Sequence, residues 1–238
     1  MLLYYIRHGQ SANNALFDTT GAEVGRVKDP ELTTVGIQQA DLLANGICNS
    51  QPFFRPQVFQ TSGFGITHLY TSLMVRAVLT ALPVSQALGL PLMGWTDLHE
   101  GGGIFLADPK TDELVGYPGA TRAELTARFP TLIWPDGTRE DGWWNRPFEA
   151  VPDRKLRARR VLAQLLARHG GTDDRVALVS HGGFFYRFMC AVLDVDDPEG
   201  LWFSMYNTAV SCIEFATDGG VAIRYLNRTN HLPAKLIT

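Results

Sequence analysis

The chain has little of several features that mark specialised classes of protein. Its formal net charge is only −3 over 238 residues, which gives no general attraction toward nucleic acid or anionic lipid. It has three cysteines, an odd number without the spacing of a metal or disulfide motif. Because each cysteine lies in an apolar stretch, we expect buried free thiols. No apolar run reaches the roughly 18 residues that would indicate a membrane span.

The beginning of the chain lacks the charged and apolar segments of a secretory signal, because a run typical of a strand, residues 2–6, starts at once. We therefore expect a cytoplasmic protein with neither membrane nor nucleic-acid partners. Apolar residues make up 45% of the chain and charged residues 19%, which is enough for a substantial core and excludes a disordered or fibrous class. The length fits one domain with a sizeable insertion. Nothing in the sequence indicates the oligomeric state.

Short apolar runs alternate with amphipathic segments over most of the chain. Strands are predicted at residues 2–6, 68–70, 92–95, 176–179, 210–215 and 221–226, the last two joined by a hairpin turn at 218–220. Helices are predicted near residues 35–45, 73–88, 122–129, 154–168 and 183–193. This alternation predicts a three-layer αβα sandwich around a mostly parallel central sheet.

Residues 101–152 interrupt the alternation with a run of three glycines, several prolines and clustered aromatic residues. We expect an irregular insertion that acts as a cap within a single domain spanning 1–238. Its aromatic side chains should form a small satellite core. The alternative is that Trp143 or Trp144 lines the mouth of a pocket and selects a bulky phosphate ester.

Three short motifs each follow a predicted strand and precede a predicted helix: Arg7-His8-Gly9, the segment 72–77 that contains Arg76, and Ser180-His181-Gly182-Gly183. Parallel strands of an open α/β sheet end at one common edge, where ligands bind. Two histidines and two arginines that are distant in the sequence are therefore expected to meet around one small anion.

These residue types suit phosphoryl transfer. A neutral imidazole at His8 can attack phosphorus and form a phosphohistidine, which divides one difficult step into two. The guanidinium groups of Arg7 and Arg76 match phosphate oxygens, and their charge disfavours protonation of His8. His181 precedes a helix N-terminus, where backbone dipoles favour an anion. Two arginines would repel a metal ion, so we expect neither a metal nor another cofactor.

Hydrolysis of an alkyl phosphate also requires a proton for the leaving oxygen. Glu100, after the strand near residue 95, is the candidate best placed to supply it, and a neighbouring phosphate dianion should raise its pKa. Glu23, Asp29 and Glu113 remain alternatives at this point.

Five motifs in order resemble the histidine phosphatase superfamily, the phosphoglycerate-mutase-like proteins, and in particular its phosphatases. They are Arg-His-Gly-Gln-Ser-Ala-Asn-Asn at 7–14, Leu-Thr-Thr-Val-Gly at 32–36 with Gln39-Ala40, Tyr70-Thr71-Ser72 with Arg76-Ala77, Leu98-His99-Glu100, and 180–183. The resemblance covers residues 1–100 and 153–215. It implies a small phosphorylated substrate and no cofactor.

The resemblance further implies a role for each matched residue. His8 would accept the phosphoryl group and Glu100 would donate the proton. Arg7, Arg76 and His181 would hold the phosphate. Asn14 would be an accessory phosphate contact, and we also expect Ser11 and Gly182 to line the substrate site.

Two departures from the mutases of this family favour a phosphatase. The segment after Glu100 lacks the basic residues that hold a second acidic group of the substrate, and Gly182-Gly183 stands where mutases tend to have Gly-Asn. The alternatives are a phosphoglycerate-type mutase and, less favoured, a non-catalytic relative that binds phosphorylated ligands.

Two further groups receive structural interpretations. The basic run 154–160 falls on a predicted helix with Leu156, Val161 and Leu162 as its apolar stripe, so we expect a solvated outer face. We expect hydrogen-bonded structural roles for the remaining isolated histidines, His68, His169 and His231.

Overall fold

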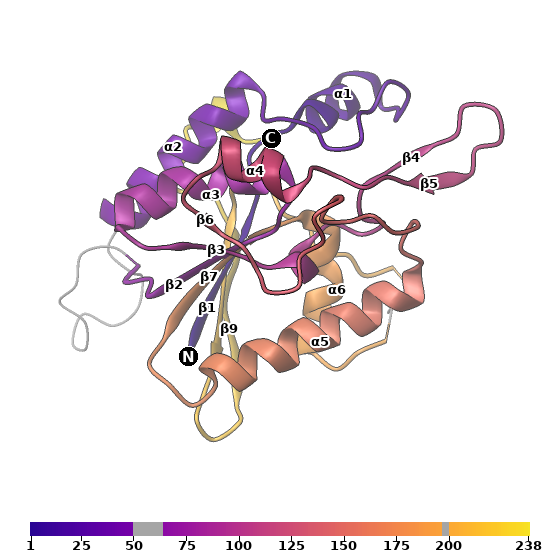
Figure 1. The fold of residues 1–238 in the computed structure, drawn as a ribbon. Coiled ribbons are helices and arrows are strands. Elements are labelled where there is room, and N and C mark those ends of the chain that lie inside the picture. The colour runs from indigo at the N-terminus through magenta and orange to yellow at the C-terminus, as the bar shows by residue number, and fades with distance from the viewer. Residues whose placement is uncertain (50–63, 197–199) are drawn as a thin grey trace.

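A seven-stranded sheet runs through the centre of the fold (Figure 1). The computed structural model describes residues 1–49, 64–196 and 200–238. The strands lie in the order β6-β3-β2-β7-β1-β8-β9, parallel from β6 to β1 and antiparallel from β1 through β8 to β9. Their bounds are β1 (Leu2–Arg7), β2 (His68–Thr71), β3 (Leu92–Gly94), β6 (Leu132–Ile133), β7 (Arg175–Ser180), β8 (Val210–Phe215) and β9 (Val221–Arg228). The predicted mostly parallel sheet is confirmed.

Helices cover both faces of this sheet. One layer contains α2 (Thr34–Asn49) and α3 (Val75–Leu88), and the other contains α5 (Val151–His169) and α6 (Gly182–Val192) (Figure 1). Side chains of β1 alternate between the two cores: Tyr4 and Ile6 pack with the first layer, and Leu3 and Tyr5 with the second. A strand buried on both faces must be apolar at every position, which accounts for the uninterrupted run at the start of the chain.

The register of the parallel strands brings the three motifs to one edge. Arg7 at the end of β1 pairs with Ser180 at the end of β7, and Thr71 at the end of β2 lies beside Val179. The residues that follow these strands, His8, Ser72 and His181, therefore emerge together. A shorter helix, α1 (Ala12–Thr20), begins just beyond His8.

The segment 101–152 is more regular than the sequence predicts. It contains the hairpin β4 (Phe105–Ala107) and β5 (Leu114–Gly116), helix α4 (Arg122–Arg128), and β6, which pairs with β3 and extends the main sheet. Two short 3₁₀ turns, η1 (Thr96–Leu98) and η2 (Ala234–Leu236), complete the described elements.

Trp143 and Trp144 belong to the core. Both are 1% exposed, and they join the same cluster as α2 and α3 rather than a separate satellite. Gly103, with φ +77°, permits this packing, since a Cβ there would lie 2.1 Å from the Trp144 ring. The hypothesis that either tryptophan lines the mouth of the substrate pocket is therefore wrong.

The solvated face predicted for 154–160 is wrong at two positions. Arg157 is 2% exposed, whereas Leu156 is 59% exposed. The buried stripe of α5 runs through Arg157, Val161 and Leu165, which are spaced by four residues, so the helix is rotated relative to the prediction.

Arg157 joins α5 to the segment that carries Glu100. Its Nε and Nη2 donate to the carboxylate of Glu149 at 2.6 and 2.8 Å. Its Nη1 donates to the carbonyls of Asp97 and His99 at 2.7 and 2.9 Å. The carbonyl between them, that of Leu98, accepts from Ser180 Oγ at 2.7 Å. Three consecutive carbonyls are thus fixed immediately before Glu100.

Two other expectations concern the whole chain. Cys190 and Cys212 are buried and Cys48 is half-buried, and all three are free thiols. Across the described ranges, no helix is both long enough and apolar enough to cross a bilayer.

Replacing Arg157 by methionine should lower the free energy of unfolding by about 3–5 kcal/mol, because the Glu149 carboxylate would stay buried without its partner. The double variant Arg157→Met with Glu149→Gln should recover part of this loss. Denaturant unfolding measures both, with Arg159→Met on the exposed face of the same helix as a control. A double variant as unstable as the single one would contradict the account.

Candidate active site

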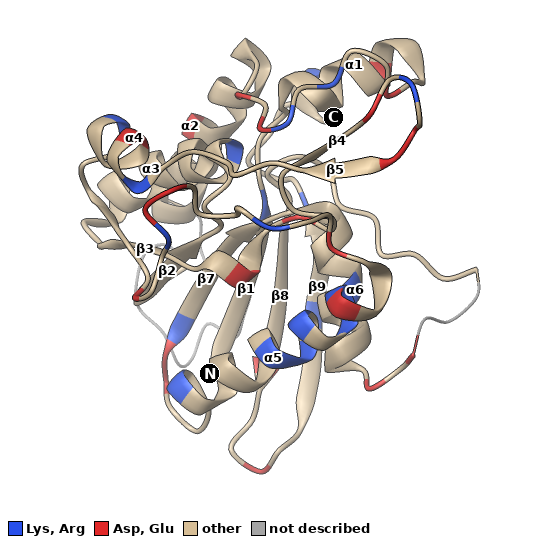
Figure 2. Cartoon of the chain, turned by 45° about the vertical axis from the view of Figure 1, so that its right-hand side comes forward, with Lys and Arg blue, Asp and Glu red and all other residues tan. Residues whose placement is uncertain are grey.

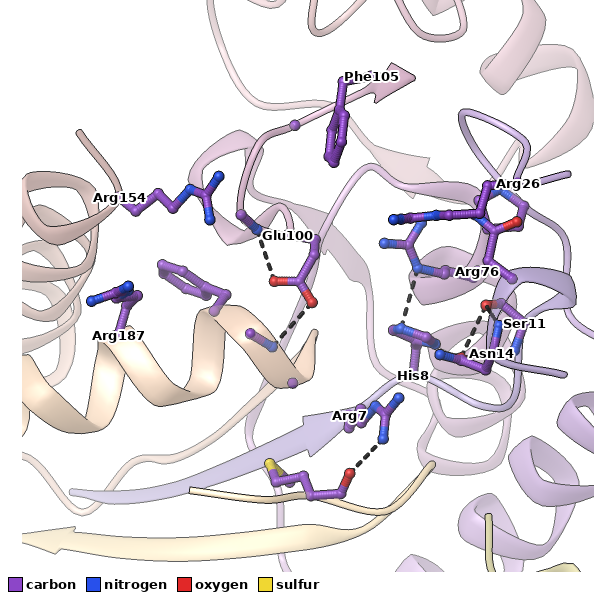
Figure 3. Close-up of a pocket in the computed structure, with 18 of the residues that line it drawn as sticks. Arg7, His8, Ser11, Asn14, Arg26, Arg76, Glu100, Phe105, Arg154 and Arg187 are labelled. Carbon is purple, nitrogen blue, oxygen red and sulfur yellow. Dashed lines mark hydrogen bonds between the residues drawn. The ribbon is translucent and has the colours of Figure 1, made fainter. Parts of the chain in front are cut away.

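A cavity of about 530 Å³ opens at the edge of the sheet where the three motifs emerge. Residues from the ends of β1 and α1, from α3, from the segment after η1, and from α5 and α6 line it (Figure 3). The site residues predicted from sequence that line it are Arg7, His8, Ser11, Asn14, Arg76, Glu100 and Gly182.

The imidazole of His8 is held in one tautomer. Its Nδ1 lies 2.7 Å from the carbonyl oxygen of Gly9, which can only accept, so Nδ1 carries the proton. Its Nε2 accepts from Nε of Arg76 at 3.2 Å, so the one lone pair of Nε2 points toward Arg76, which lines the same cavity (Figure 3). A phosphoryl group must replace this contact before Nε2 can attack it. The backbone is fixed as well: His8 N donates to Ser180 O at 2.9 Å, and Asn207 Nδ2 donates to His8 O at 2.9 Å.

The surroundings of His8 keep its ring neutral. Burial lowers the pKa of His8 well below the ordinary 6.5, and the charges of Arg76 and Arg7 lower it further. An imidazole that stays unprotonated at neutral and mildly acidic pH retains the lone pair that a nucleophile needs.

The loop after His8 packs backbone against backbone on the start of α2. A Cβ on Gly9 would lie 2.6 Å from Gly36 O, and one on Gly36 would lie 2.1 Å from Gln10 O. Gln10 N donates to Gln39 Oε1 at 2.7 Å. The glycine at position 9 is therefore required by its contact with α2, and the motif at 32–36 supports the nucleophile loop.

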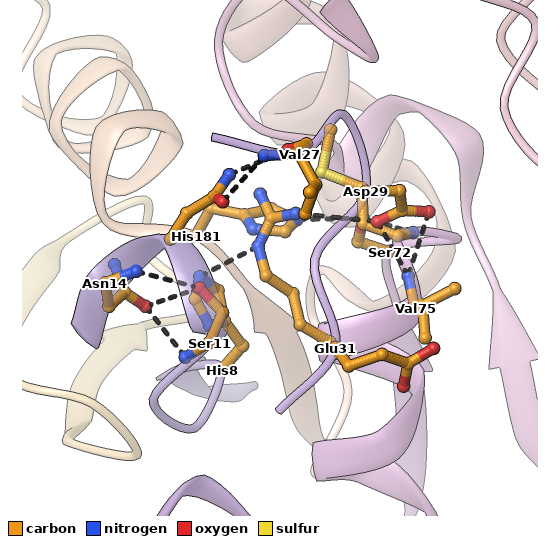
Figure 4. Close-up of polar contacts among 12 residues, drawn as sticks. His8, Ser11, Asn14, Val27, Asp29, Glu31, Ser72, Val75 and His181 are labelled. Atoms are coloured by element: carbon orange, nitrogen blue, oxygen red, sulfur yellow. Dashed lines mark hydrogen bonds and ion pairs between the residues drawn. The ribbon is translucent and has the colours of Figure 1, made fainter. Parts of the chain in front are cut away.

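The two predicted arginines have different anchors. Arg7 Nη1 donates to Met205 O at 2.5 Å, and its buried Nε has no partner in the part of the chain that the structure describes. Arg76 lies 3.6 Å from Asp29 Oδ1. Burial raises the pKa of Asp29 to about 6, although the charge of Arg76 opposes this. Asp29 also accepts from Val75 N at the start of α3, and so orients Arg76 from outside the cavity (Figure 4).

His181 lies beside His8 but does not line the cavity. The two ring centroids are 5.1 Å apart, and His181 is fully buried. Ser72 Oγ accepts from Met74 N at 3.2 Å and lies 2.9 Å from His181 Nε2 (Figure 4). Nδ1 of His181 is buried and has no hydrogen-bond partner among the described residues.

Unpartnered buried polar atoms are rare in proteins, and a bound ion or ligand is one explanation for them. Nδ1 of His181 and Nε of Arg7 are two such atoms next to His8. Burial and the charge of Arg76 lower the pKa of His181 well below 6.5, so the ring is neutral and donates through one nitrogen only.

Ser11 and Asn14 form the capping box of α1. Oδ1 of Asn14 accepts from Ser11 N at 3.1 Å, from Ser11 Oγ at 2.9 Å and from Asn207 Nδ2 at 3.3 Å. Because Oδ1 faces these three donors, the NH₂ group of Asn14 points away from them and can donate to a ligand. The hydroxyl proton of Ser11 is used by Asn14, so Ser11 positions Asn14. Asn207, which no sequence motif indicates, joins His8 to Asn14.

Glu100 is the one carboxylate among the described residues that line this cavity. Its Oε1 accepts from Gly101 N at 2.8 Å and its Oε2 from Gly183 N at 3.0 Å. A Cβ on Gly183 would lie 2.6 Å from Oε1, so the second glycine of the 180–183 motif is needed for this contact. The alternative acids lie elsewhere: Glu23 and Glu113 are exposed, and Asp29 lies behind Arg76.

More basic residues line the cavity than the motifs predict. The described basic residues are Arg7, Arg26, Lys28, Arg76, Arg154, Arg157 and Arg187. The segment after Glu100 does lack basic residues, but α5, α6 and the loop after α1 supply them instead. Several basic residues, coloured blue, lie along the ribbon of α5 (Figure 2). Positive charge is therefore concentrated at this cavity, although the net charge of the chain is −3.

The only group in the described ranges that could hold a metal is His68, His169 and Asp174, at the opposite edge of the sheet. His169 Nδ1 lies 2.8 Å from Asp174 Oδ2, and its Nε2 lies 3.0 Å from the hydroxyl of Tyr70. These contacts satisfy both ring nitrogens of His169. Nε2 of His231 lies 3.1 Å from Thr208 Oγ1. These hydrogen bonds fit the structural roles predicted for His169 and His231.

The fold and site together define an α/β protein with an anion site built around an uncharged, buried histidine. A family profile described as the histidine phosphatase superfamily (branch 1) matches residues 3–229. The chain belongs to this superfamily.

The chain is similar in sequence to two curated proteins from mycobacteria. Glucosyl-3-phosphoglycerate phosphatase of Mycolicibacterium vanbaalenii is 26% identical over 198 residues, covering 80% of this chain and 73% of that protein. The PE-PGRS family protein PE_PGRS11 of Mycobacterium tuberculosis is 25% identical over 235 residues, or 92% of this chain. This chain spans only 35% of the length of PE_PGRS11.

A solved structure shows the same fold. A mutant phosphoserine phosphatase from Entamoeba histolytica, in complex with phosphoserine, superimposes with a TM-score of 0.61 at 20% identity. The match covers 98% of this chain and 99% of the other.

His8 should not titrate in the range of a free histidine. In nitrogen-15 spectra of histidine-labelled protein, we expect the His8 ring to remain in the neutral Nδ1–H tautomer through the pH range in which a free histidine titrates, because burial, Arg76 and Arg7 lower its pKa. In the Arg76→Gln variant the midpoint should move toward higher pH. A midpoint near 6.5 in the unsubstituted protein would contradict the proposed electrostatics.

Proposed function

We propose that this protein is a phosphomonoester hydrolase that acts through a phosphohistidine at His8 and requires no metal. The observation that carries the proposal is the Nδ1-protonated His8, whose unprotonated Nε2 contacts Arg76 in a cavity lined by several cationic residues and, among the described residues, one carboxylate. The named phosphatases among its relatives support the same reaction class.

In the first step, Nε2 of His8 attacks the phosphorus atom of the bound ester. Arg7 and Arg76 hold the phosphoryl oxygens, with the amide of Asn14 as a further donor. The ring of His181 lies next to His8, and we propose that it reaches the phosphoryl group when the ester is bound. A nitrogen–phosphorus bond forms and the phosphorus–ester oxygen bond breaks. The carboxyl of Glu100 gives its proton to the departing alkoxide. The Gly9 carbonyl stabilises the Nδ1–H of the phosphorylated ring.

In the second step, a water molecule attacks the phosphohistidine. The Glu100 carboxylate takes a proton from this water, the nitrogen–phosphorus bond breaks, and inorganic phosphate leaves. Glu100 is then protonated and His8 is neutral again, so the cycle closes. The fixed guanidinium groups supply the positive charge that a metal provides in other phosphatases, which is why we propose that none is needed.

His8→Ala should abolish turnover of p-nitrophenyl phosphate while leaving the protein folded, because it removes the nucleophile. Rapid acid-free quenching of the unsubstituted enzyme with a phosphorus-32 substrate should yield an acid-labile adduct that maps to residue 8.

Activity of the unsubstituted enzyme should persist in the presence of a metal chelator, and vanadate should inhibit it. Turnover by His8→Ala comparable with that of the parent enzyme would refute the mechanism, and loss of activity in chelator would refute metal independence.

Glu100→Gln should affect substrates according to their leaving group. An alkyl alkoxide needs protonation, so we expect kcat/KM for glycerol 3-phosphate to fall by about 100- to 10,000-fold. The p-nitrophenolate ion leaves without a proton, so its release from the enzyme should slow far less in a single-turnover burst. Equal losses for both substrates would show that Glu100 does not act as the proton donor.

A further inference from the structure

The cavity has more positive charge than one phosphoryl group requires. Arg7 and Arg76 lie against His8 and suffice for a phosphate dianion. Arg154 and Arg187 lie on the other side of Glu100 from His8 (Figure 3). Since the Glu100 carboxylate stands between the two groups, a phosphoryl group in reach of His8 is separated from Arg154 and Arg187.

Arg154 is held in place by the protein. Its Nε donates to Glu149 O at 3.1 Å, and its guanidinium carbon lies 5.1 Å from the centre of the Phe148 ring. It rests on Gly101, where a Cβ would lie 3.1 Å from Nη1. These contacts fix the plane of the guanidinium and leave its two terminal nitrogens for another acceptor.

Arg154 forms no ion pair with any described residue, although it is half-buried. Burial lowers its pKa, and the charges of Glu149 and Glu100 oppose this while Arg187 reinforces it. Arg187 on α6 also lines the cavity, and Glu100 is the one carboxylate among the described lining residues. An anion beside Arg154 would satisfy the fork of its guanidinium.

Two further basic residues line the cavity from the loop after α1. Arg26 lies 2.9 Å from Glu23, and Lys28 lies 4.7 Å from the centre of the Tyr117 ring. Arg154 has no carboxylate partner among the described residues, so its end of the cavity can accept a second anionic group.

We propose that Arg154 and Arg187 bind a second anionic group of the substrate, a carboxylate or a phosphate. This inference rests on the proposed function, because the attack by His8 places the first phosphoryl group. The substrate class is then the phosphomonoester of a small acid, and phosphate esters of neutral alcohols of the same size are poor substrates.

Two matched pairs of compounds test the inference. 3-Phosphoglycerate and glycerol 3-phosphate share a three-carbon skeleton and differ in the carboxylate. 1,3-Propanediol bisphosphate and its monophosphate differ in a second phosphate. We expect kcat/KM to favour the doubly anionic member of at least one pair by about 10- to 100-fold, mainly through KM. The pair with the larger ratio identifies the second group.

Arg154→Gln should bring this ratio to within about threefold of one, while Arg154→Lys, which keeps the charge without the fork, should retain part of it. The control Arg159→Gln removes an equal charge from the exposed face of α5 and should leave the ratio unchanged. Thermal melting verifies that each variant is folded.

The outcomes separate the two proposals. A ratio near one for both pairs, or a ratio that survives in folded Arg154→Gln, would overturn the second anion site while His8-dependent hydrolysis stands. If the unsubstituted enzyme hydrolyses no phosphomonoester, including p-nitrophenyl phosphate, the proposed function itself fails. Conversion of 3-phosphoglycerate to its 2-isomer without net release of phosphate would likewise replace the hydrolase by a mutase.

Discussion

The site depends on keeping one imidazole uncharged among fixed positive charges. Gly9 O accepts from Nδ1–H of His8 and fixes the tautomer, and Arg76 donates to Nε2, a contact that protonation of Nε2 would disrupt. The same burial that disfavours a charged histidine also strengthens the attraction of the arginines for an incoming anion. One arrangement therefore provides both the nucleophile and the site for the group that it attacks.

The rest of the fold supports this arrangement through backbone contacts. Ser180 O accepts from His8 N, and Ser180 Oγ donates to Leu98 O, so a residue at the end of β7 fixes both the nucleophile and the segment that carries the acid. Arg157 fixes the same segment from α5. The distance between His8 and Glu100 is thereby set by the sheet and a buried ion pair.

Most of the sheet and the centre of the site could be predicted from the sequence, because buried parallel strands are uninterrupted apolar runs and their ends share an edge. The contacts of Asp29 and Asn207 could not, since each depends on a loop that crosses to another element. The burial of Arg157 could not be predicted either from the pattern of apolar and polar residues along α5. When arginine is counted as a polar residue, the predicted orientation of α5 is rotated and Leu156 is placed in the core instead of Arg157.

The same limitation explains why the basic residues at the far end of the cavity escape motif analysis. A motif groups residues close in sequence, whereas Arg154 and Arg187 come from two helices that cover the same face of the sheet. The reacting groups must follow strand ends, so their sequence context is constrained. Residues that bind the rest of a substrate need only reach the cavity from any neighbouring helix, and their identity can differ while the reacting groups stay fixed.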